Sequence, residues 1–497
     1  MLHKKAIVIG SGFAGLSAAS FLAKNGCEVT IVEKHATPGG RARSFSAHGF
    51  TFDMGPSWYW MPDVFDRYFA QFGKKTSDYY SLERLDPSYR VYWPEEEATD
   101  IPANYDQLKK VFESIEPGSG EQLDKFLIEA AYKYEVGIQK LVFKPSQSFT
   151  EFINPQLISG IFKLDVFSTM KKHVAKYFNN PRLTELMEFP VLFLGALPEK
   201  TPALYSLMNY ADIKGGTWYP QGGMVKIAEG MHQLATSLGV KFVFNADVQQ
   251  INTNNKEARG ISYKLKGESL VMEADVIVAA ADYHHVETKL LSPIHRTYND
   301  NYWNSRVMAP SCLLYYVGLN KKLKNIAHHS LFFDTSFAQH GKEIYTTKEW
   351  PSDPLFYVSA TSVTDESVAP AGCENLFLLI PIASGLNGDS EEIRKKYFEA
   401  IVKRMESKLG ETIKESIIYY RSFAVSDFID EYNSFKGNAY GLANTLLQTA
   451  VLKPSCRSKK LKNLFYAGQL TVPGPGVPPS LISGEVVANE IVKFFNS

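Results

Sequence analysis

A glycine-spaced turn lies between a predicted strand and a predicted helix at the start of the chain. Residues 4–9 form an almost continuous apolar run, which is typical of a buried parallel strand. A G-x-G-x-x-G turn follows at residues 10–15, and residues 14–25 carry apolar side chains at helical spacing. A second short strand is predicted over residues 28–32. This order confines the first part of the chain to an α/β fold with a parallel sheet.

Each glycine of this turn has a mechanical role. Gly10 permits the tight turn, Gly12 lets the backbone approach a pyrophosphate, and Gly15 lets the helix pack closely on the strand. The free N–H groups of the helix's first turn stabilise phosphate charge. Glu33 ends the second strand, where a carboxylate accepts hydrogen bonds from both ribose hydroxyls. An unphosphorylated 2′-hydroxyl is therefore predicted, which suits FAD or NAD and disfavours NADP.

Two further stretches favour FAD over NAD. Gly39 and Gly40 are placed to pass near the pyrophosphate, and Arg41 is placed to pair with it. Residues 53–58 then make a stiff turn, Asp-Met-Gly-Pro-Ser-Trp, for which a nicotinamide dehydrogenase has no need. A second glycine- and proline-rich stretch, at residues 466–480, nearly closes the chain. One dinucleotide held jointly by both ends of the polypeptide is therefore predicted.

The composition bounds the partners of the chain. A length of 497 residues predicts two or three lobes. Lys and Arg together number 53, as do Asp and Glu, so no basic field favours nucleic acid. The chain has 32 Phe, 27 Tyr and 6 Trp residues, more than a core alone requires. This surplus suits a large apolar ligand cavity.

The cysteines and the apolar runs suggest a compartment. The four cysteines lie far apart and form no C-x-x-C pair, so neither a zinc nor a redox motif is indicated. Reduced, cytoplasmic residence is the simplest interpretation. No signal peptide is predicted before the first strand, and no apolar run approaches the ~18 residues that span a bilayer.

Hydrophobic spacing predicts further elements. An apolar run over residues 272–281 would return the chain to the parallel sheet. Val248, in a nearby strand, would offer its backbone amide and carbonyl to an adenine edge. A capping box at residues 389–392 would start a helix that ends before Gly410. The other predicted strands cover residues 90–94, 240–244, 248–251, 313–318, 355–360 and 376–382, and the other helices cover residues 63–72, 122–141 and 224–238.

Residues 142–178 combine many apolar side chains with a basic flank. Lys163, Lys171, Lys172 and Lys176 are interleaved with the apolar residues or follow them. Such a segment is able to lie in a membrane interface. A lid helix packed on its own protein is the alternative interpretation.

Several longer motifs carry a family resemblance. Residues 437–443 read Gly-Asn-Ala-Tyr-Gly-Leu-Ala, residues 463–468 read Asn-Leu-Phe-Tyr-Ala-Gly, and residues 473–478 read Pro-Gly-Pro-Gly-Val-Pro. Further matches lie at residues 193–198 and 219–224 and at the pair His328-His329. With these motifs the chain resembles, essentially end to end, the bacterial carotenoid (phytoene) desaturase family of flavoproteins.

The resemblance implies a fold similar to that of monoamine oxidase. The expected fold class is α/β, with a Rossmann-like FAD-binding domain, an interleaved α+β substrate domain and a helical, membrane-associated lid. The expected FAD-binding parts are residues 1–75, 211–290 and 436–497, the substrate-domain parts are 76–130 and 291–435, and the lid is 131–210.

The resemblance also implies an extended FAD, with its adenine end at the first motif and its ring toward residues 468–478. Related flavoproteins often read Gly-Asp at the last motif, whereas this chain has Gly468-Gln469, which brings no charge. The expected cofactor-binding residues are Gly10, Gly12, Phe13, Ala14, Gly15, Glu33, Lys34, Gly39, Gly40, Arg41, Gly55, Pro56, Ser57, Val248, Gly468, Gln469, Gly476, Val477 and Pro478.

The implied reaction is desaturation of a long acyclic carotenoid, with phytoene to lycopene as the first choice. Hydride would pass to flavin N5 and a proton would leave the adjacent carbon, while an apolar tunnel aligns the polyene. The electron acceptor would be oxygen or a quinone, and the protein would lie peripherally on the inner membrane. The alternatives are 3,4-desaturation of a hydroxylated carotenoid, carotenoid isomerisation or saturation, and a prenyl-binding protein similar to GDP-dissociation inhibitors.

One acid/base residue is carried over from the family. Proposals for the family place such a pair on a Ser-Phe-x-Asp/Glu segment with a nearby arginine. This chain has Ser148-Phe-Thr-Glu151, but Asn154 stands where the arginine would fall. Glu151 is therefore the predicted catalytic residue, with a helix-start carboxylate as the alternative. No metal site is predicted, since the pair His328-His329 has no acid or cysteine at useful spacing.

Overall fold

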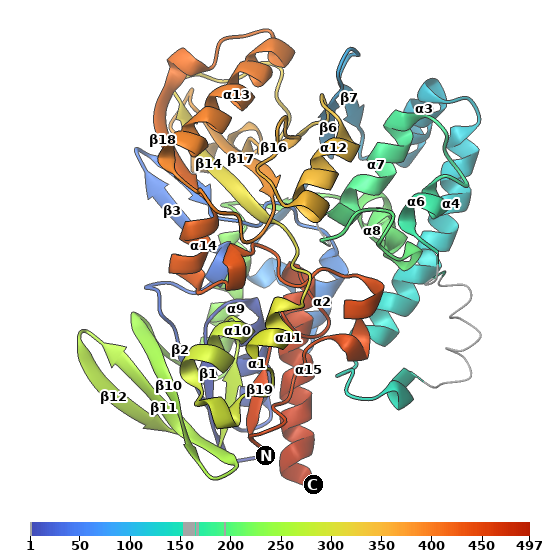
Figure 1. Cartoon of the computed structure of the whole chain (residues 1–497). Helices are drawn as coiled ribbons and strands as arrows, with labels where there is room; N and C mark the ends of the chain where they lie inside the picture. The colour runs from blue at the N-terminus through green and yellow to red at the C-terminus, as the bar shows by residue number, and fades with distance from the viewer. Residues whose placement is uncertain (1, 153–164, 166–167, 193–194) are drawn as a thin grey trace.

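The structure is a computed structural model that describes residues 2–152, 165, 168–192 and 195–497 (Figure 1). A five-stranded parallel sheet, in the lower half of the view, is built from three separate stretches of the chain. Its order is β9 (Lys241–Val243), β2 (Glu28–Val32), β1 (Lys5–Ile9), β13 (Val276–Ala279) and β19 (Leu464–Tyr466). The first motif and the last motif thereby follow two strands of the same sheet, β1 and β19.

Both faces of this sheet are buried, one under helices and the other under a small sheet. Successive side chains of a strand point to opposite faces, so they alternate between these two layers. Ala6 and Val8 of β1 pack with the helices, whereas Ile7 and Ile9 pack with a three-stranded antiparallel meander. The helices are α1 (Phe13–Lys24), α9 (Val225–Ser237) and α15 (Val477–Asn496). The meander consists of β10 (Ala246–Asn254), β11 (Glu257–Leu265) and β12 (Glu268–Glu273).

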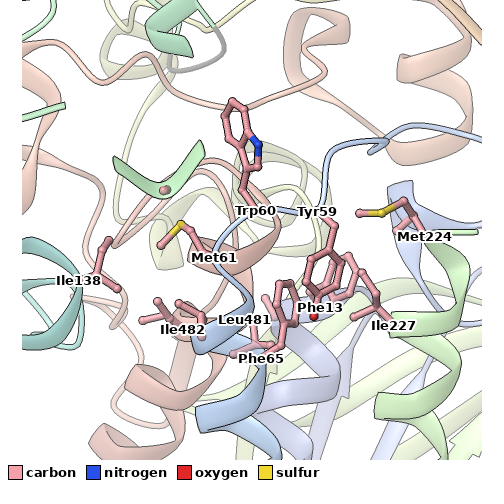
Figure 2. Packing of buried hydrophobic residues seen from close by; sticks show 14 of the residues in the cluster. Phe13, Tyr59, Trp60, Met61, Phe65, Ile138, Met224, Ile227, Leu481 and Ile482 are labelled. Atoms are coloured by element: carbon pink, nitrogen blue, oxygen red, sulfur yellow. The ribbon is translucent and has the colours of Figure 1, made fainter. Parts of the chain in front are cut away.

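The C-terminal helix lies directly against the N-terminal one. A Cβ atom at Gly484 would lie 2.3 Å from the carbonyl oxygen of Ala14, so only glycine permits this approach. Figure 2 shows Phe13 of α1, Ile227 of α9, and Leu481 and Ile482 of α15 among the buried side chains of this core. The neighbouring helix α2 (Pro62–Ala70) contributes Phe65 to the same core.

A second, seven-stranded sheet lies in the upper half of Figure 1. Its strand β14 is buried on both faces, with Leu314 and Tyr316 in the core that includes α1, and Leu313 and Tyr315 in a core with α13 (Glu391–Leu409). All of its pairings are antiparallel except that of β15 with β6. The order is β18 (Ile417–Phe423), β14 (Ser311–Leu319), β17 (Glu374–Ile382), β16 (Phe356–Ser359), β15 (His329–Phe332), β6 (Tyr89–Tyr92) and β7 (Thr99–Ile101).

A group of helices lies at the right of Figure 1. It comprises α3 (Tyr105–Ile115), α4 (Ser119–Tyr134), α6 (Met170–Val174), α7 (Pro181–Leu192) and α8 (Leu207–Tyr210). Much of the segment expected to contact a membrane, residues 142–178, lies outside the described residues, as does the start of the 193–198 motif. Within the described part of the chain, no helix is both long and apolar enough to cross a membrane.

The remaining elements are short. Two small sheets pair β3 (Ser44–Ala47) with β4 (Phe50–Asp53), and β5 (Leu82–Arg84) with β8 (Trp218–Pro220). The remaining helices are α10 (Tyr283–His285), α11 (Asp300–Asn304), α12 (Phe337–Lys342) and α14 (Val425–Tyr432).

Three sequence expectations differ from the structure. The run 272–281 is not one strand, because the chain passes from β12 to β13 at Ala274 and Asp275, whose amides bond outside both strands. Residues 122–141 are helical, but the last turn and a half, Glu135–Leu141, is π-helical. The cap of α13 is Ser390 and not the first residue of the predicted box, since Asp389 instead pairs with Arg394 at 2.7 Å.

Candidate active site

One cavity of about 420 Å³ is lined by residues of both large sheets. All of the predicted cofactor-binding residues except Gly15 line it. Gly15 has a different place, because a Cβ atom there would lie 2.0 Å from the carbonyl oxygen of Gly10. It therefore allows the start of α1 to pack on the turn, as the spacing of the motif predicts.

Glu33 is held rigidly at one end of the cavity. Its Oε2 atom accepts hydrogen bonds from both the amide and the hydroxyl of Ser11, each at 2.7 Å. Its Oε1 atom accepts from the amide of His35 at 2.9 Å. Glu33 is buried, so these donors compensate the loss of water around the carboxylate. Ser11 was not among the predicted site residues, although it stands inside the glycine motif.

Arg41 lines the cavity, and only some of its hydrogen-bond donors have partners in the protein. Its Nη2 atom donates to Ser434 Oγ at 3.0 Å, and its guanidinium lies 5.2 Å from the ring centre of Tyr432. With the Gln469 amide oriented to satisfy both groups, Gln469 Oε1 accepts from Nη2 and Nη1 at 3.0 and 3.1 Å. Within the described structure the buried Nε atom of Arg41 has no hydrogen-bond partner.

This unpaired donor fits the phosphate part of FAD. A buried guanidinium that lines a cavity beside glycine backbone is a ready partner for an anion. Asp282, an acid that interacts electrostatically with Arg41, is already engaged, because it accepts from the amides of His285 and Phe435 at 3.0 and 3.1 Å. Burial raises the pKa of Asp282 to about 6, against the lowering effect of these amides and Arg41. Asp282 follows the carboxyl end of β13 and could have been found from that position.

The C-terminal motif completes the same wall. Gly468 and Gly476 adopt φ values of +121° and +114°, which other residues rarely adopt. The amide of Gly468 donates to Ser483 Oγ of α15 at 2.9 Å, which fixes the loop on the helix. The positive end of the α15 dipole, at Val477, lines the cavity and favours electron-rich oxygen atoms of a flavin.

The other end of the cavity is apolar and aromatic. Trp58 and Trp60 come from the loop after β4, whereas Tyr357 and Leu379 come from the seven-stranded sheet. Sequence reasoning did not find these side chains, apart from predicting that aromatic residues would surround an apolar ligand. The apolar end is lined by Met54, Trp58, Trp60, Met61, Met208, Cys312, Leu314, Tyr357, Leu379 and Tyr440.

The histidine pair is buried behind this apolar end. His329 stacks on Trp58, with ring centres 4.2 Å apart, and its Nδ1 atom lies 2.7 Å from the Tyr357 hydroxyl. His328 Nδ1 lies 2.8 Å from the Thr364 hydroxyl. Burial lowers the pKa of His328 to about 3 and that of His329 well below its usual value, so both are neutral near pH 7. Their rings thus act as packing and hydrogen-bonding groups.

Glu151 does not line the cavity among the described residues. Its carboxylate accepts from the amides of Ser146, Gln147 and Ser148 at 2.9, 2.7 and 3.0 Å. These bonds order the loop before its own short helical turn, Phe149–Phe152. The catalytic role of Glu151 stays a prediction.

One cavity thus joins a dinucleotide end, a buried arginine whose Nε atom has no partner among the described residues, and an apolar end. This combination is typical of a flavin-dependent oxidoreductase. Residues 13–492 match the family model described as flavin containing amine oxidoreductase, and the chain belongs to this family. It is an FAD-dependent oxidoreductase, as the sequence predicted. The expected α/β fold similar to that of the amine oxidases is confirmed, whereas the membrane-associated lid stays a prediction.

Individual relatives refine the comparison. The chain is 40% identical to a carotenoid 3,4-desaturase of Haloarcula japonica, over 98% of this chain and 97% of the relative. It is 30% identical to a zeta-carotene-forming phytoene desaturase of Myxococcus xanthus, over 98% and 94%. The solved structure of a putrescine oxidase bound to putrescine aligns with a TM-score of 0.62 at 14% identity, covering 99% of each chain. The resemblance to the carotenoid desaturases, stated from motifs, is thereby confirmed.

Proposed function

We propose that the protein desaturates a long acyclic carotenoid, with phytoene converted toward lycopene as the first choice. The observation that carries this proposal is that one cavity, of about 420 Å³, joins a dinucleotide site to an apolar, aromatic compartment. Bound FAD would supply the hydride acceptor. A hydrocarbon substrate offers little to hydrogen bonds, so the apolar walls would bind it and orient it while excluding water.

The chain's own residues would divide the work. Glu33, Arg41 and the glycine turns would hold the nucleotide part of the cofactor, and the loop of residues 55–57 with the start of α15 would hold the ring. Trp58, Tyr357 and their apolar neighbours would align the polyene. With the oxidoreductase family established, the prenyl-binding alternative has no supporting observation.

A second candidate is 3,4-desaturation of a hydroxylated acyclic carotenoid. The 40% identity to the carotenoid 3,4-desaturase of Haloarcula japonica favours 3,4-desaturation over isomerisation or saturation. One observation is against this candidate. The described residues that line the apolar end of the cavity are mainly hydrocarbon, which suits an unmodified hydrocarbon substrate better.

The test of these two candidates is a competition assay. The protein is incubated with FAD and liposomes that contain phytoene and a hydroxylated acyclic carotenoid, with oxygen or a quinone as electron acceptor. New double bonds in phytoene support the first candidate, and products of the hydroxylated substrate alone support the second. No desaturated product with any acceptor would reject both.

We further propose that the protein takes its substrate from a membrane surface. Leu446, Leu447 and Leu452 lie in one segment and have exposed fractions of 45%, 76% and 44%. Clustered exposed leucines favour insertion among lipid headgroups. Leu447→Gln should weaken flotation with liposomes, whereas Ile294→Gln, at an equally exposed site elsewhere, should not. Equal flotation of both variants and the wild type would contradict this proposal.

A further inference from the structure

A second, smaller cavity adjoins the apolar end of the first. It has a volume of about 50 Å³ and shares Tyr357, Leu379 and Tyr440 with the larger cavity. These three side chains, here called the throat, therefore lie where the two cavities meet. The second cavity lies against β15, β16 and β17 and is closed by α12 and the π-helical turn Glu343–Thr347.

The lining of the second cavity is hydrocarbon almost throughout. Leu331, Phe333, Phe337, Ile344 and Leu355 are all at least nine-tenths buried. A cavity this small, with apolar walls, has room for a compact branched group and no partners for water.

The polar groups around this cavity are already engaged. His340 Nε2 lies 2.9 Å from the carbonyl oxygen of Pro381, and His340 Nδ1 accepts from the amide of Leu355 at 3.0 Å. The Tyr357 hydroxyl is bonded to His329, outside the cavity lining. Tyr345 and Tyr440 are likewise not without partners. A hydroxyl brought into this cavity would therefore lose its bonds to water without compensation.

We propose that this second cavity, the end-group pocket, takes the unmodified branched terminus of the acyclic polyene. The polyene would pass from the apolar end of the larger cavity into the end-group pocket at the throat. This inference rests on the proposed function and adds the chemistry of the substrate's end. A terminal hydroxyl should lower affinity about 10- to 100-fold, since an apolar pocket rejects an added hydroxyl only to that extent. The end-group pocket thus selects hydrocarbon termini over hydroxylated ones.

The experiment compares two carotenoids with the same polyene. Lycopene has two hydrocarbon ends, whereas 1,1′-dihydroxylycopene has none. Each is titrated into the FAD-loaded protein in detergent micelles, and binding is followed by quenching of tryptophan fluorescence, because Trp58 and Trp60 line the larger cavity. At least about 10-fold tighter binding of lycopene is expected. Equal affinity for the two would overturn the proposal.

Three variants at one site sharpen the test. Ile344→Phe should fill the end-group pocket and weaken lycopene binding about 10-fold, whereas Ile344→Leu conserves volume and should bind as the wild type does. Ile344→Thr adds a hydroxyl partner and should reduce the preference for lycopene. Thermal midpoint and FAD content show whether each variant is folded.

The outcomes distinguish a failure of the end-group pocket from a failure of the proposed substrate. A folded Ile344→Phe variant with wild-type affinity would overturn the pocket assignment, even if phytoene is desaturated. If Ile344→Phe does not fold, the comparison of the two carotenoids on the wild type still decides. Absence of phytoene desaturation by a wild type that discriminates between the two carotenoids would reject the proposed substrate but leave the end-group pocket standing.

Discussion

The Tyr357 hydroxyl lies 2.7 Å from Nδ1 of His329, across the antiparallel pair β16 and β15. Trp58 stacks on the face of the same histidine ring, with 4.2 Å between ring centres. The stacking and the hydrogen bond restrict the positions of all three rings. Tyr357 also lines both cavities. The hydrogen bond therefore fixes the wall against which a substrate would lie.

Tyr357→Phe keeps this wall but removes the bond. His329 Nδ1 is then left buried without a partner, which should cost about 1–3 kcal/mol of stability. Because the ring remains, kcat/KM for the carotenoid should change only a few-fold, whereas Tyr357→Ala should lower it much more. Thermal unfolding and initial rates check both statements. A large loss of turnover in Tyr357→Phe at full FAD content would instead make the hydroxyl a reacting group.

The buried histidines predict acid sensitivity. The pKa of His328 is about 3 and that of His329 lies well below its usual value, both through burial. In the unfolded chain both would titrate near about 6.5. Between these values the unfolded state binds more protons, so stability falls as pH decreases below about 6.5, by up to about 1.4 kcal/mol per unit for each histidine. Above about pH 7 both states are neutral and this effect vanishes.

The check is a series of thermal midpoints between about pH 7.5 and 5. His329→Gln should show a shallower fall than the wild type, because one titrating group is gone. Parallel curves for the two proteins would show that His329 is not held neutral by the fold.

Arg41→Met tests the cofactor assignment. It removes the charge that faces the cavity, so the affinity for FAD should fall at least about 10-fold, a typical cost for a charge-assisted bond to phosphate. Arg43→Met is the matched control, since Arg43 pairs with Glu431 at 3.0 Å and does not line the cavity. FAD titration followed by flavin fluorescence measures both. Equal affinities in the two variants would exclude Arg41 from the binding site.

Gly484→Ala tests the junction between the two ends of the chain. The new Cβ atom would meet the Ala14 carbonyl oxygen, so α15 must move away from α1, at a cost of about 1–3 kcal/mol. FAD retention should fall together with the thermal midpoint, because both helices begin at the cavity. Gly215→Ala, where no atom lies within 4 Å, should leave both unchanged. An unaltered Gly484→Ala protein would mean that the junction tolerates displacement.

Glu151→Gln distinguishes a catalytic role of Glu151 from a role in ordering the loop of residues 146–148. The three backbone amides around the carboxylate lead us to expect a lower thermal midpoint with turnover per bound flavin retained. A loss of turnover at an unchanged midpoint would instead support Glu151 as the acid/base residue.

The sequence predicts the dinucleotide end better than the apolar end, for a physical reason. Gly10, Gly12 and Glu33 act through backbone geometry and a strand end, which local spacing reveals. Tyr357 and Leu379 are brought together by the pairing of β16 with β17, and either could have filled an ordinary core. No local pattern marks which face of a buried strand meets a ligand.

Two local expectations failed in an instructive way. Asp389 looks like a helix cap, but its ion pair with Arg394 leaves that place to Ser390. The apolar run over 272–281 hides a break at Asp275, whose carboxylate accepts from the amide of Lys5 at 2.8 Å. At Asp275 a contact with a distant strand overrode the local pattern, and at Asp389 a side-chain ion pair did so.

The most direct test mixes FAD-loaded protein with phytoene micelles under anaerobic conditions and records the visible flavin absorption together with the carotenoid products. The account predicts that the oxidised flavin bleaches in step with the appearance of a carotenoid that has an additional double bond. Flavin that stays oxidised while phytoene is recovered unchanged would contradict it.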